Sequence, residues 1–329
     1  MLDRLTLPLI GLSLAIAACG GGEPQADTPP DAPATPAPST PPADVVRTGD
    51  PAVRGYADSE FPRVQEIAPG VFTYEQLAAV GGARITTNSF FVVTTEGVLV
   101  ADGQGSAEET ERLISEIAEV SNGQPIRTVV IGSDHPDHVG GSSAFPAGVT
   151  FLAHPHSIER LRARNAAPAN LQPVEDERTI TMGGRTIRVL HLGRAHTGGD
   201  LMVHLPQERV LFMSEVFLNH IFPSLGDSYP QEWVETLQEA RAIDVEVFVP
   251  GHGFVDPPSV LAEEVAAFQG ALTAMIGAVE GVHDEGAAVD EALGRAQFGD
   301  AATWVRAENL REPAIRRIYS DLNGELGTP

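Results

Sequence analysis

Short segments of apolar residues, bounded by glycine, proline and polar residues, predict β-strands along much of the chain. Residues 85–94 and 98–101 are rich in β-branched and aromatic side chains, and the turn at 95–97 predicts a hairpin between them. Gly97 suits that turn because glycine adopts positive φ without steric cost. The same kind of pattern predicts further strands at 71–75, 128–131, 188–192, 209–213 and 247–249, and a second hairpin at 180–187.

Helical periodicity occupies the stretches between several of these strands. Apolar residues recur on one face of an amphipathic helix at 107–120, and a second helix is predicted at 231–243. After Pro258 the pattern is helical almost to the end, with 261–282 the longest segment. The roughly 270 residues from 56 to 329 are enough for one large two-layer α/β domain.

The first 19 residues predict a lipoprotein signal peptide. An apolar run at 5–18 follows Arg4; it is too short to span a bilayer as a helix but suits the core of a signal peptide. It ends in the sequence IAAC, which resembles a bacterial lipobox with cleavage before Cys19 and lipid attached to its thiol. The alternative is an ordinary secretory signal whose cysteine is incidental. Because Gly20 follows rather than aspartate, we expect export to the periplasmic side of the outer membrane.

Residues 20–55 predict a disordered tether. They consist largely of Gly, Pro, Ala, Thr and Asp, with few large apolar residues, so they cannot bury a core of their own. Such a segment would hold the domain at 56–329 away from the membrane. Cys19 is the only cysteine in the sequence, which excludes an internal disulfide and a thiolate metal ligand.

The charge balance limits the partners of the protein. The sequence has 21 basic residues, none of them lysine, and 45 acidic residues, for a formal net charge of −24. An acidic surface repels phosphodiester backbones, and proteins that bind nucleic acids depend mainly on cationic contacts. We therefore expect a small-molecule substrate and no nucleic-acid partner.

Four of the predicted strands end in side chains that bind metal ions in proteins. The segment SDHPDH follows 128–131 after one glycine, and its last four residues bring two imidazoles and a carboxylate close together. This is unfavourable unless a cation neutralises the carboxylate and accepts the imidazole lone pairs, although the segment taken alone also fits a polar, solvated turn. Comparable strand ends carry His196 in the glycine-rich loop HTGGD, Glu215 in FMSE, and His252 between two glycines in VPGHG.

In this order and with these gaps, the motifs SDHPDHVGG, HTGGD, FMSE and VPGHG resemble those of the metallo-β-lactamase superfamily of metallo-hydrolases. The resemblance extends from about residue 65 to the C-terminus. It implies an α/β fold of the αββα sandwich type, with one or two metal ions, usually zinc, at one edge. It also implies that Asp102, after the strand at 98–101, supports the ligands from behind by hydrogen bonding. The implied metal ligands are His135, Asp137, His138, His196, Glu215 and His252.

Two positions depart from the superfamily pattern. Ser133 stands where the first motif usually begins with histidine, so a nitrogen donor is replaced by a weak hydroxyl or water-mediated contact. We expect this first site, with His135 and His196, to bind metal less tightly. Glu215 stands where the superfamily usually has a bridging aspartate. Its extra methylene requires either a relaxed bridge or ligation of a single ion.

The implied chemistry is hydrolysis. A bound zinc ion lowers the pKa of a coordinated water from about 16 to near 7 and so supplies hydroxide at neutral pH. The resemblance implies that Asp137 orients the attacking water and later passes a proton to the leaving group. The expected substrate is a small ester, lactone, thioester or amide, with β-lactams among the candidates. The competing interpretation is a non-catalytic metal-binding accessory or sensing protein, which Ser133 and Glu215 favour.

Three further residues are candidates for substrate contacts. Asn219 and His220 follow Glu215 in a loop where the superfamily often shapes its substrate pocket, and a purely structural role is the alternative. Arg194 precedes His196 by two residues. It either meets a substrate carboxylate or forms a salt bridge within the protein.

Overall fold

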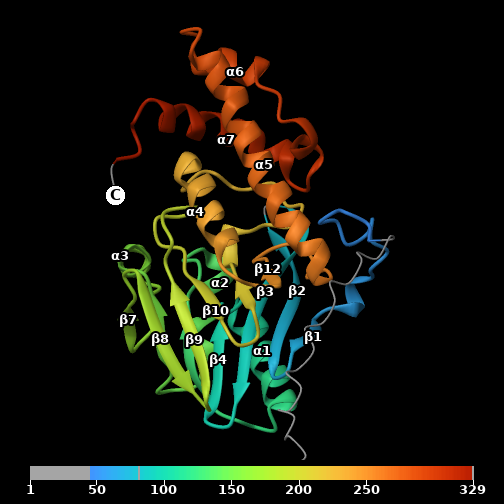
Figure 1. Cartoon of the computed structure of the whole chain (residues 1–329), viewed down its shortest axis with the longest axis vertical. Coiled ribbons are helices and arrows are strands. Elements are labelled where there is room, and N and C mark those ends of the chain that lie inside the picture. Colours follow the sequence, from blue (N-terminus) through green and yellow to red (C-terminus); the bar gives the residue numbers. More distant parts are fainter. Residues whose placement is uncertain (1–44, 81, 328–329) are drawn as a thin grey trace, which may run out of the picture. The chain divides into compact units, whose positions relative to one another are not determined.

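The computed structural model describes residues 45–80 and 82–327, so the predicted signal peptide, with Cys19, and the tether up to residue 44 lie outside the described residues. Two β-sheets form the centre of the domain (Figure 1). The first sheet has seven strands, which follow one another in chain order. They are β1 (Arg63–Ala68), β2 (Val71–Val80), β3 (Ala83–Thr94), β4 (Gly97–Ala101), β5 (Ile126–Val130), β6 (Thr150–Ala153) and β7 (Leu171–Pro173).

The second sheet has five strands in the order β12-β11-β10-β9-β8. They are β8 (Glu177–Met182), β9 (Arg185–Leu190), β10 (Met202–Leu205), β11 (Val210–Phe212) and β12 (Val247–Val249). Both predicted hairpins are present, as β3 with β4 and β8 with β9. In the first sheet β4 to β7 are parallel, and in the second only β11 and β12 are parallel.

Alternation along the strands divides the apolar side chains between two cores. In β4, Leu99 and Ala101 face the core shared with the second sheet, whereas Val98 and Val100 face the helices outside the first sheet. The shared core includes the stacked rings of Phe90 and Phe212, whose centroids are 5.4 Å apart. This period of two arises because successive strand side chains point to opposite faces.

Helices cover the outer faces of both sheets, which confirms the predicted αββα sandwich. Side chains of α1 (Ala107–Val120) and α3 (Pro155–Ala163) pack into the core outside the first sheet. Side chains of α4 (Pro230–Ala242) and α5 (Pro258–His283) join the core that contains the second sheet. The remaining helices are α2 (Pro136–Val139), α6 (Val289–Arg295) and α7 (Ala307–Leu322), and short 3-10 turns lie at Asp58–Glu60, Ser142–Ala144, Ser214–Val216 and Gly299–Thr303.

The helix ends follow local sequence signals. The prediction for α1 is confirmed at both bounds: the Ser106 side chain accepts a hydrogen bond from the Glu109 amide and caps the first turn. By length and composition α5 is apolar enough to cross a membrane. Val265, Phe268 and Leu272 are among its side chains that pack in the core, which accounts for much of this apolar character.

The last part of the predicted tether packs on the domain. Arg47 forms ion pairs with Glu263, at 2.7 Å, and with Glu264. Arg54 donates two hydrogen bonds to the Asp256 carboxylate, at 2.6 and 2.8 Å. These arginines attach residues 45–55, part of the predicted tether, to the α5 region, a contact that composition does not reveal.

Candidate metal centre

The predicted ligands meet because the ends of parallel strands lie together. Asp102 and Ser133 follow β4 and β5, which are parallel neighbours in the first sheet. Glu215 and His252 follow β11 and β12, the parallel pair of the second sheet. A bridge between Thr87 and His252 joins the two sheets at this edge.

Glycines allow the backbones to approach closely here. A Cβ on Gly132 would lie 2.6 Å from the Ser214 side chain, and one on Gly251 would lie 2.4 Å from the Ser214 carbonyl carbon. Real Cβ atoms do not approach other atoms so closely. Gly132, just before the first motif, and Gly251, in the last motif, are therefore required where their loops contact the turn that carries Glu215.

Two groups of side chains converge in the way that metal ligands do. One contains Asp137, His138, Glu215 and His252, and the other contains His135, His196 and Glu215. In each group the candidate ligand atoms lie within 4.8 Å of one another. The structure thus brings together all six predicted ligands, and Glu215 belongs to both groups.

The separations between these atoms fit a metal ion. The Nε2 atoms of His138 and His252 are 3.2 Å apart, and His196 Nε2 lies 3.1 Å from His135 Nδ1. His252 Nε2 lies 3.2 Å from Asp137 Oδ2 and 3.3 Å from Glu215 Oε1. Tetrahedral zinc with bonds of about 2.0–2.1 Å places its ligand atoms about 3.3 Å apart. Facing imidazole lone pairs repel each other unless a cation or a proton lies between them.

In His138 and His252, the ring nitrogen that faces away from the cluster donates a hydrogen bond to an acceptor outside it. His138 Nδ1 donates to Asp102 Oδ2 at 3.0 Å, and His252 Nδ1 donates to the Thr86 carbonyl at 2.8 Å. Because these oxygens only accept, each bond leaves the Nε2 lone pair directed at the cluster. Asp102 is itself held by the Gly132 amide at 2.6 Å. The structure places Asp102 where the sequence predicted it, behind the ligands.

Comparison with known proteins identifies the family. The profile of the metallo-beta-lactamase superfamily matches residues 83–252, just over half of the chain. The chain belongs to the metallo-beta-lactamase superfamily. A "Metallo-beta-lactamase type 2" from a Bacillus species is 24% identical over 206 residues, which cover 60% of this chain and 79% of that protein. The alpha subunit of a 2,4-dinitroanisole O-demethylase from a Nocardioides species is 25% identical over 134 residues, or 39% of this chain and 41% of that protein.

Solved structures show the same fold. A metallo-beta-lactamase from Pontibacter korlensis superposes with a TM-score of 0.57 at 22% identity, covering 63% of this chain and 98% of its own. A metallo-beta-lactamase from Hirschia baltica gives a TM-score of 0.55 at 18% identity, covering 63% of this chain and 97% of its own. Membership of this superfamily implies metal-dependent hydrolase chemistry, and the convergent His, Asp and Glu side chains are candidates for the metal site.

Ser133 and Glu215, the two residues that depart from the superfamily pattern, contact each other. The Ser133 hydroxyl donates to Glu215 Oε2 at 2.5 Å, and the same oxygen lies 2.8 Å from His135 Nδ1. Glu215 Oε1 instead lies 3.2 Å from His196 Nε2. Ser133 therefore contacts Glu215 directly, and Glu215 belongs to both groups of candidate ligands.

The buried charges of the centre shift each other's pKa values. Burial lowers the pKa of His135, but Glu215 and Asp227 outweigh it and raise it to about 11. Burial likewise opposes the charged form of His252, yet Asp137 and Glu215 raise its pKa to about 10. Burial raises the pKa of Asp137, whereas His138 and His252 hold it below its usual range. Without metal, protons on the imidazoles therefore balance the carboxylates.

The side chains of Asn219 and His220 contact other residues of the protein. Asn219 is buried, and its Nδ2 donates to the Phe254 carbonyl at 2.8 Å and to Asp256 at 3.0 Å. His220 Nε2 lies 2.8 Å from Glu264 Oε2. These contacts support the structural alternative for both residues rather than substrate binding.

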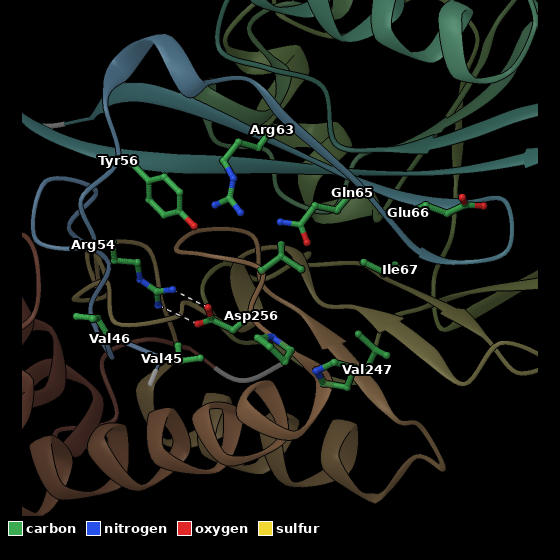
Figure 2. Close-up of a pocket in the computed structure, with 13 residues that line it drawn as sticks. Val45, Val46, Arg54, Tyr56, Arg63, Gln65, Glu66, Ile67, Val247 and Asp256 are labelled. Atoms are coloured by element: carbon green, nitrogen blue, oxygen red, sulfur yellow. Dashed lines mark hydrogen bonds and ion pairs between the residues drawn. The ribbon is translucent and has the colours of Figure 1, made fainter. Parts of the chain in front are cut away.

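A pocket of about 590 Å³ lies beside this loop, between the first described residues, β1 and the start of α5. Figure 2 shows Arg54 paired with Asp256 in the pocket lining, where Tyr56 and Arg63 are also drawn. None of the predicted metal ligands lines this pocket. Because Asp256 also accepts from Asn219, the Arg54 ion pair braces the loop that leads from the metal centre.

Arg194 forms the internal salt bridge that the sequence left as an alternative. Its Nε donates to Glu232 at 2.7 Å, and its guanidinium lies 3.9 Å from the centre of the Tyr229 ring. The sequence analysis missed Asp227, whose Oδ2 lies 3.5 Å from His135 Nε2. Asp227 follows Glu215 by 12 residues but belongs to none of the four motifs.

Proposed function

We propose that this protein is a zinc-dependent hydrolase of a small ester, lactone, thioester or amide. The observation that carries the proposal is the pair of ligand groups sharing Glu215, with ligand atoms spaced as tetrahedral zinc requires. When bound, zinc polarises a carbonyl oxygen and supplies a nucleophilic hydroxide at neutral pH. The relatives are named as acting on β-lactams and on an anisole, which supports leaving the substrate class broad.

Exposure indicates the side from which a substrate approaches. The Asp137 side chain is 22% exposed and that of His135 is 16% exposed, whereas Glu215, His138, His196 and His252 are nearly buried. Asp137 is thus the carboxylate of the centre that a substrate can meet. Its lowered pKa keeps it ionised at neutral pH, so it can orient a water molecule by accepting a hydrogen bond from it.

Turnover of a panel of chromogenic esters, lactones and β-lactams tests the proposal. We expect the zinc-loaded chain to hydrolyse at least one of them, and His138→Ala to lose about a hundredfold or more of that rate. His204→Ala is the matched control, because His204 is also a buried histidine but lies on β10. Zinc uptake without turnover of any substrate would contradict the proposal and favour the accessory or sensing protein.

We also propose that the protein is exported and anchored through lipid on Cys19, at the periplasmic side of the outer membrane. The sole cysteine at the end of the IAAC sequence supports this. We expect Cys19→Ser to move the protein from the membrane fraction to the soluble fraction of cells and to abolish incorporation of labelled palmitate. Labelling that persists in this variant would contradict the assignment.

A further inference from the structure

The pocket between the first described residues, β1 and the start of α5 has the make-up of a site for a small organic molecule. Its volume of about 590 Å³ lies within the range of such sites. Much of the lining is apolar, and Val45, Val46, Val247 and Val255 belong to it. None of the candidate metal ligands lines the pocket, so it is separate from the metal centre.

Arg63 offers hydrogen-bond donors to this pocket. Its Nη1 lies 3.2 Å from Glu75 Oε2, and within residues 45–80 and 82–327 this ion pair is the only polar contact of the guanidinium. The guanidinium carbon lies 4.4 Å from the centre of the Tyr56 ring. Figure 2 shows the polar ends of Tyr56, Arg63 and Gln65 close together. Because a guanidinium carries five N–H groups, most of them are left for a ligand.

The other charged groups of the lining are already engaged. Arg54 donates to both Asp256 oxygens, at 2.6 and 2.8 Å, and to the Thr48 carbonyl at 2.8 Å. Glu66 accepts a hydrogen bond from the Gly70 amide at 2.8 Å. Arg63 is therefore the cation of this lining that can accept a new anionic partner.

The present partner of Arg63 is a carboxylate that lies behind it. Glu75 is completely buried, and its Oε1 accepts from the Val255 amide at 2.8 Å. Burial raises the pKa of Glu75 to about 7, although Arg63 and this amide lower it. Asp256 and Arg54, the other charged groups that act on Glu75, have opposite effects. Near neutral pH Glu75 can thus take up a proton, which leaves Arg63 able to pair with a second carboxylate.

The rim of the pocket exposes an apolar side chain to water. Among the residues that the structure describes, Val46 and Val53 are the large apolar residues that are exposed, at 50% and 62%. Val46 lines the pocket, whereas Val53 does not. A ligand with an apolar body would cover Val46 and remove apolar surface from water.

We propose that this pocket binds a small organic carboxylate with an apolar body, whose charged group pairs with Arg63 and whose body contacts Val46 and Val247. Guanidinium recognises carboxylate through paired, charge-assisted hydrogen bonds. An inorganic anion would gain nothing from the apolar lining. The site lies outside the metal centre, so the inference does not depend on the proposed hydrolysis.

Hexanoate and hexan-1-ol test this inference, because they share an apolar chain and only the first carries a carboxylate. We would titrate each calorimetrically into the full chain, both zinc-loaded and metal-free. We expect hexanoate to bind more tightly than the alcohol in both forms. Arg63→Gln should reduce the affinity for hexanoate about tenfold and leave that for the alcohol unchanged. Arg188→Gln is the matched control, because Arg188 is also a strand arginine that pairs with a glutamate, Glu177, at 2.8 Å.

A second variant tests the pocket without changing the buried ion pair. Val46→Asp places a negative charge at the rim and should weaken hexanoate binding several-fold. Val53→Asp adds the same charge to the same segment outside the pocket, and it should leave the affinity unchanged.

The outcomes separate this site from the metal centre. No binding of hexanoate, equal affinities for the acid and the alcohol, or binding only in the zinc-loaded chain would overturn the proposal. An unchanged affinity for hexanoate in a folded Arg63→Gln chain would overturn it as well. If Arg63→Gln does not fold, the comparison of Val46→Asp with Val53→Asp decides, and equal affinities in these two variants would overturn the site.

Discussion

Glu215→Gln is expected to remove most of the bound zinc and to reduce hydrolysis about a thousandfold or more. Glu215 has one oxygen near His196 and His252 and the other near His135, so its loss affects both groups of ligands. A glutamine amide cannot bridge two cations, and its N–H group would face one of them. Elemental analysis after dialysis should give less than one zinc ion per variant chain.

The control for this variant is Glu264→Gln. Glu264 is another buried glutamate, and it pairs with Arg47 and His220 rather than with the metal ligands. This variant should lose some stability but keep the zinc content and turnover of the wild type. Equal zinc loss in both variants would indicate general unfolding. Full zinc content in Glu215→Gln would exclude Glu215 as a ligand.

Removal of zinc is expected to lower the free energy of unfolding by about 4 kcal/mol when free zinc had exceeded its Kd a thousandfold. The physical reason is that the metal binds the folded arrangement of His138, His252 and Glu215 and has no such site in the unfolded chain. Thermal unfolding of the dialysed metal-free chain, followed by zinc addition, measures the difference. Identical melting curves with and without zinc would contradict a metal centre.

This difference should widen as the pH rises. The pKa values of His135 and His252 are raised to about 11 and about 10 in the folded, metal-free chain, from 6.5 in the unfolded chain. Their contribution to stability is therefore complete below pH 6.5 and is lost as the pH rises through 10 to 11. Zinc displaces these protons, so its affinity increases with pH. Glu75, whose pKa burial raises to about 7, lies outside both ligand groups and affects the two forms alike.

Local sequence was sufficient to predict the elements that carry the ligands. The predicted helix at 107–120 agrees with the structure at both ends. The signals that define it, the capping Ser106 and the apolar face, are local to this segment. The strands before Ser133, Glu215 and His252 were recognisable because buried strands read as short apolar runs. The motif glycines marked the positions where backbones approach each other.

Contacts between distant parts of the chain could not be predicted from the sequence. Residues 45–55 were predicted as tether because their composition resembles the segment before them, and only Arg47 and Arg54 show the attachment to acidic residues some 200 positions later. Asn219 was a candidate for substrate contact because it lies near Glu215 in sequence. Its side-chain amide instead donates a hydrogen bond to Asp256, which follows β12.

The sequence by itself determined which residues end the strands and which of them can bind a metal, because burial periodicity and ligand chemistry are local properties. Only the tertiary structure decided that one glutamate belongs to both ligand groups and that the Ser133 hydroxyl donates to it. These facts depend on how two sheets and the C-terminal helices pack together. Packing is set by the summed burial of many distant side chains, and no single segment encodes it.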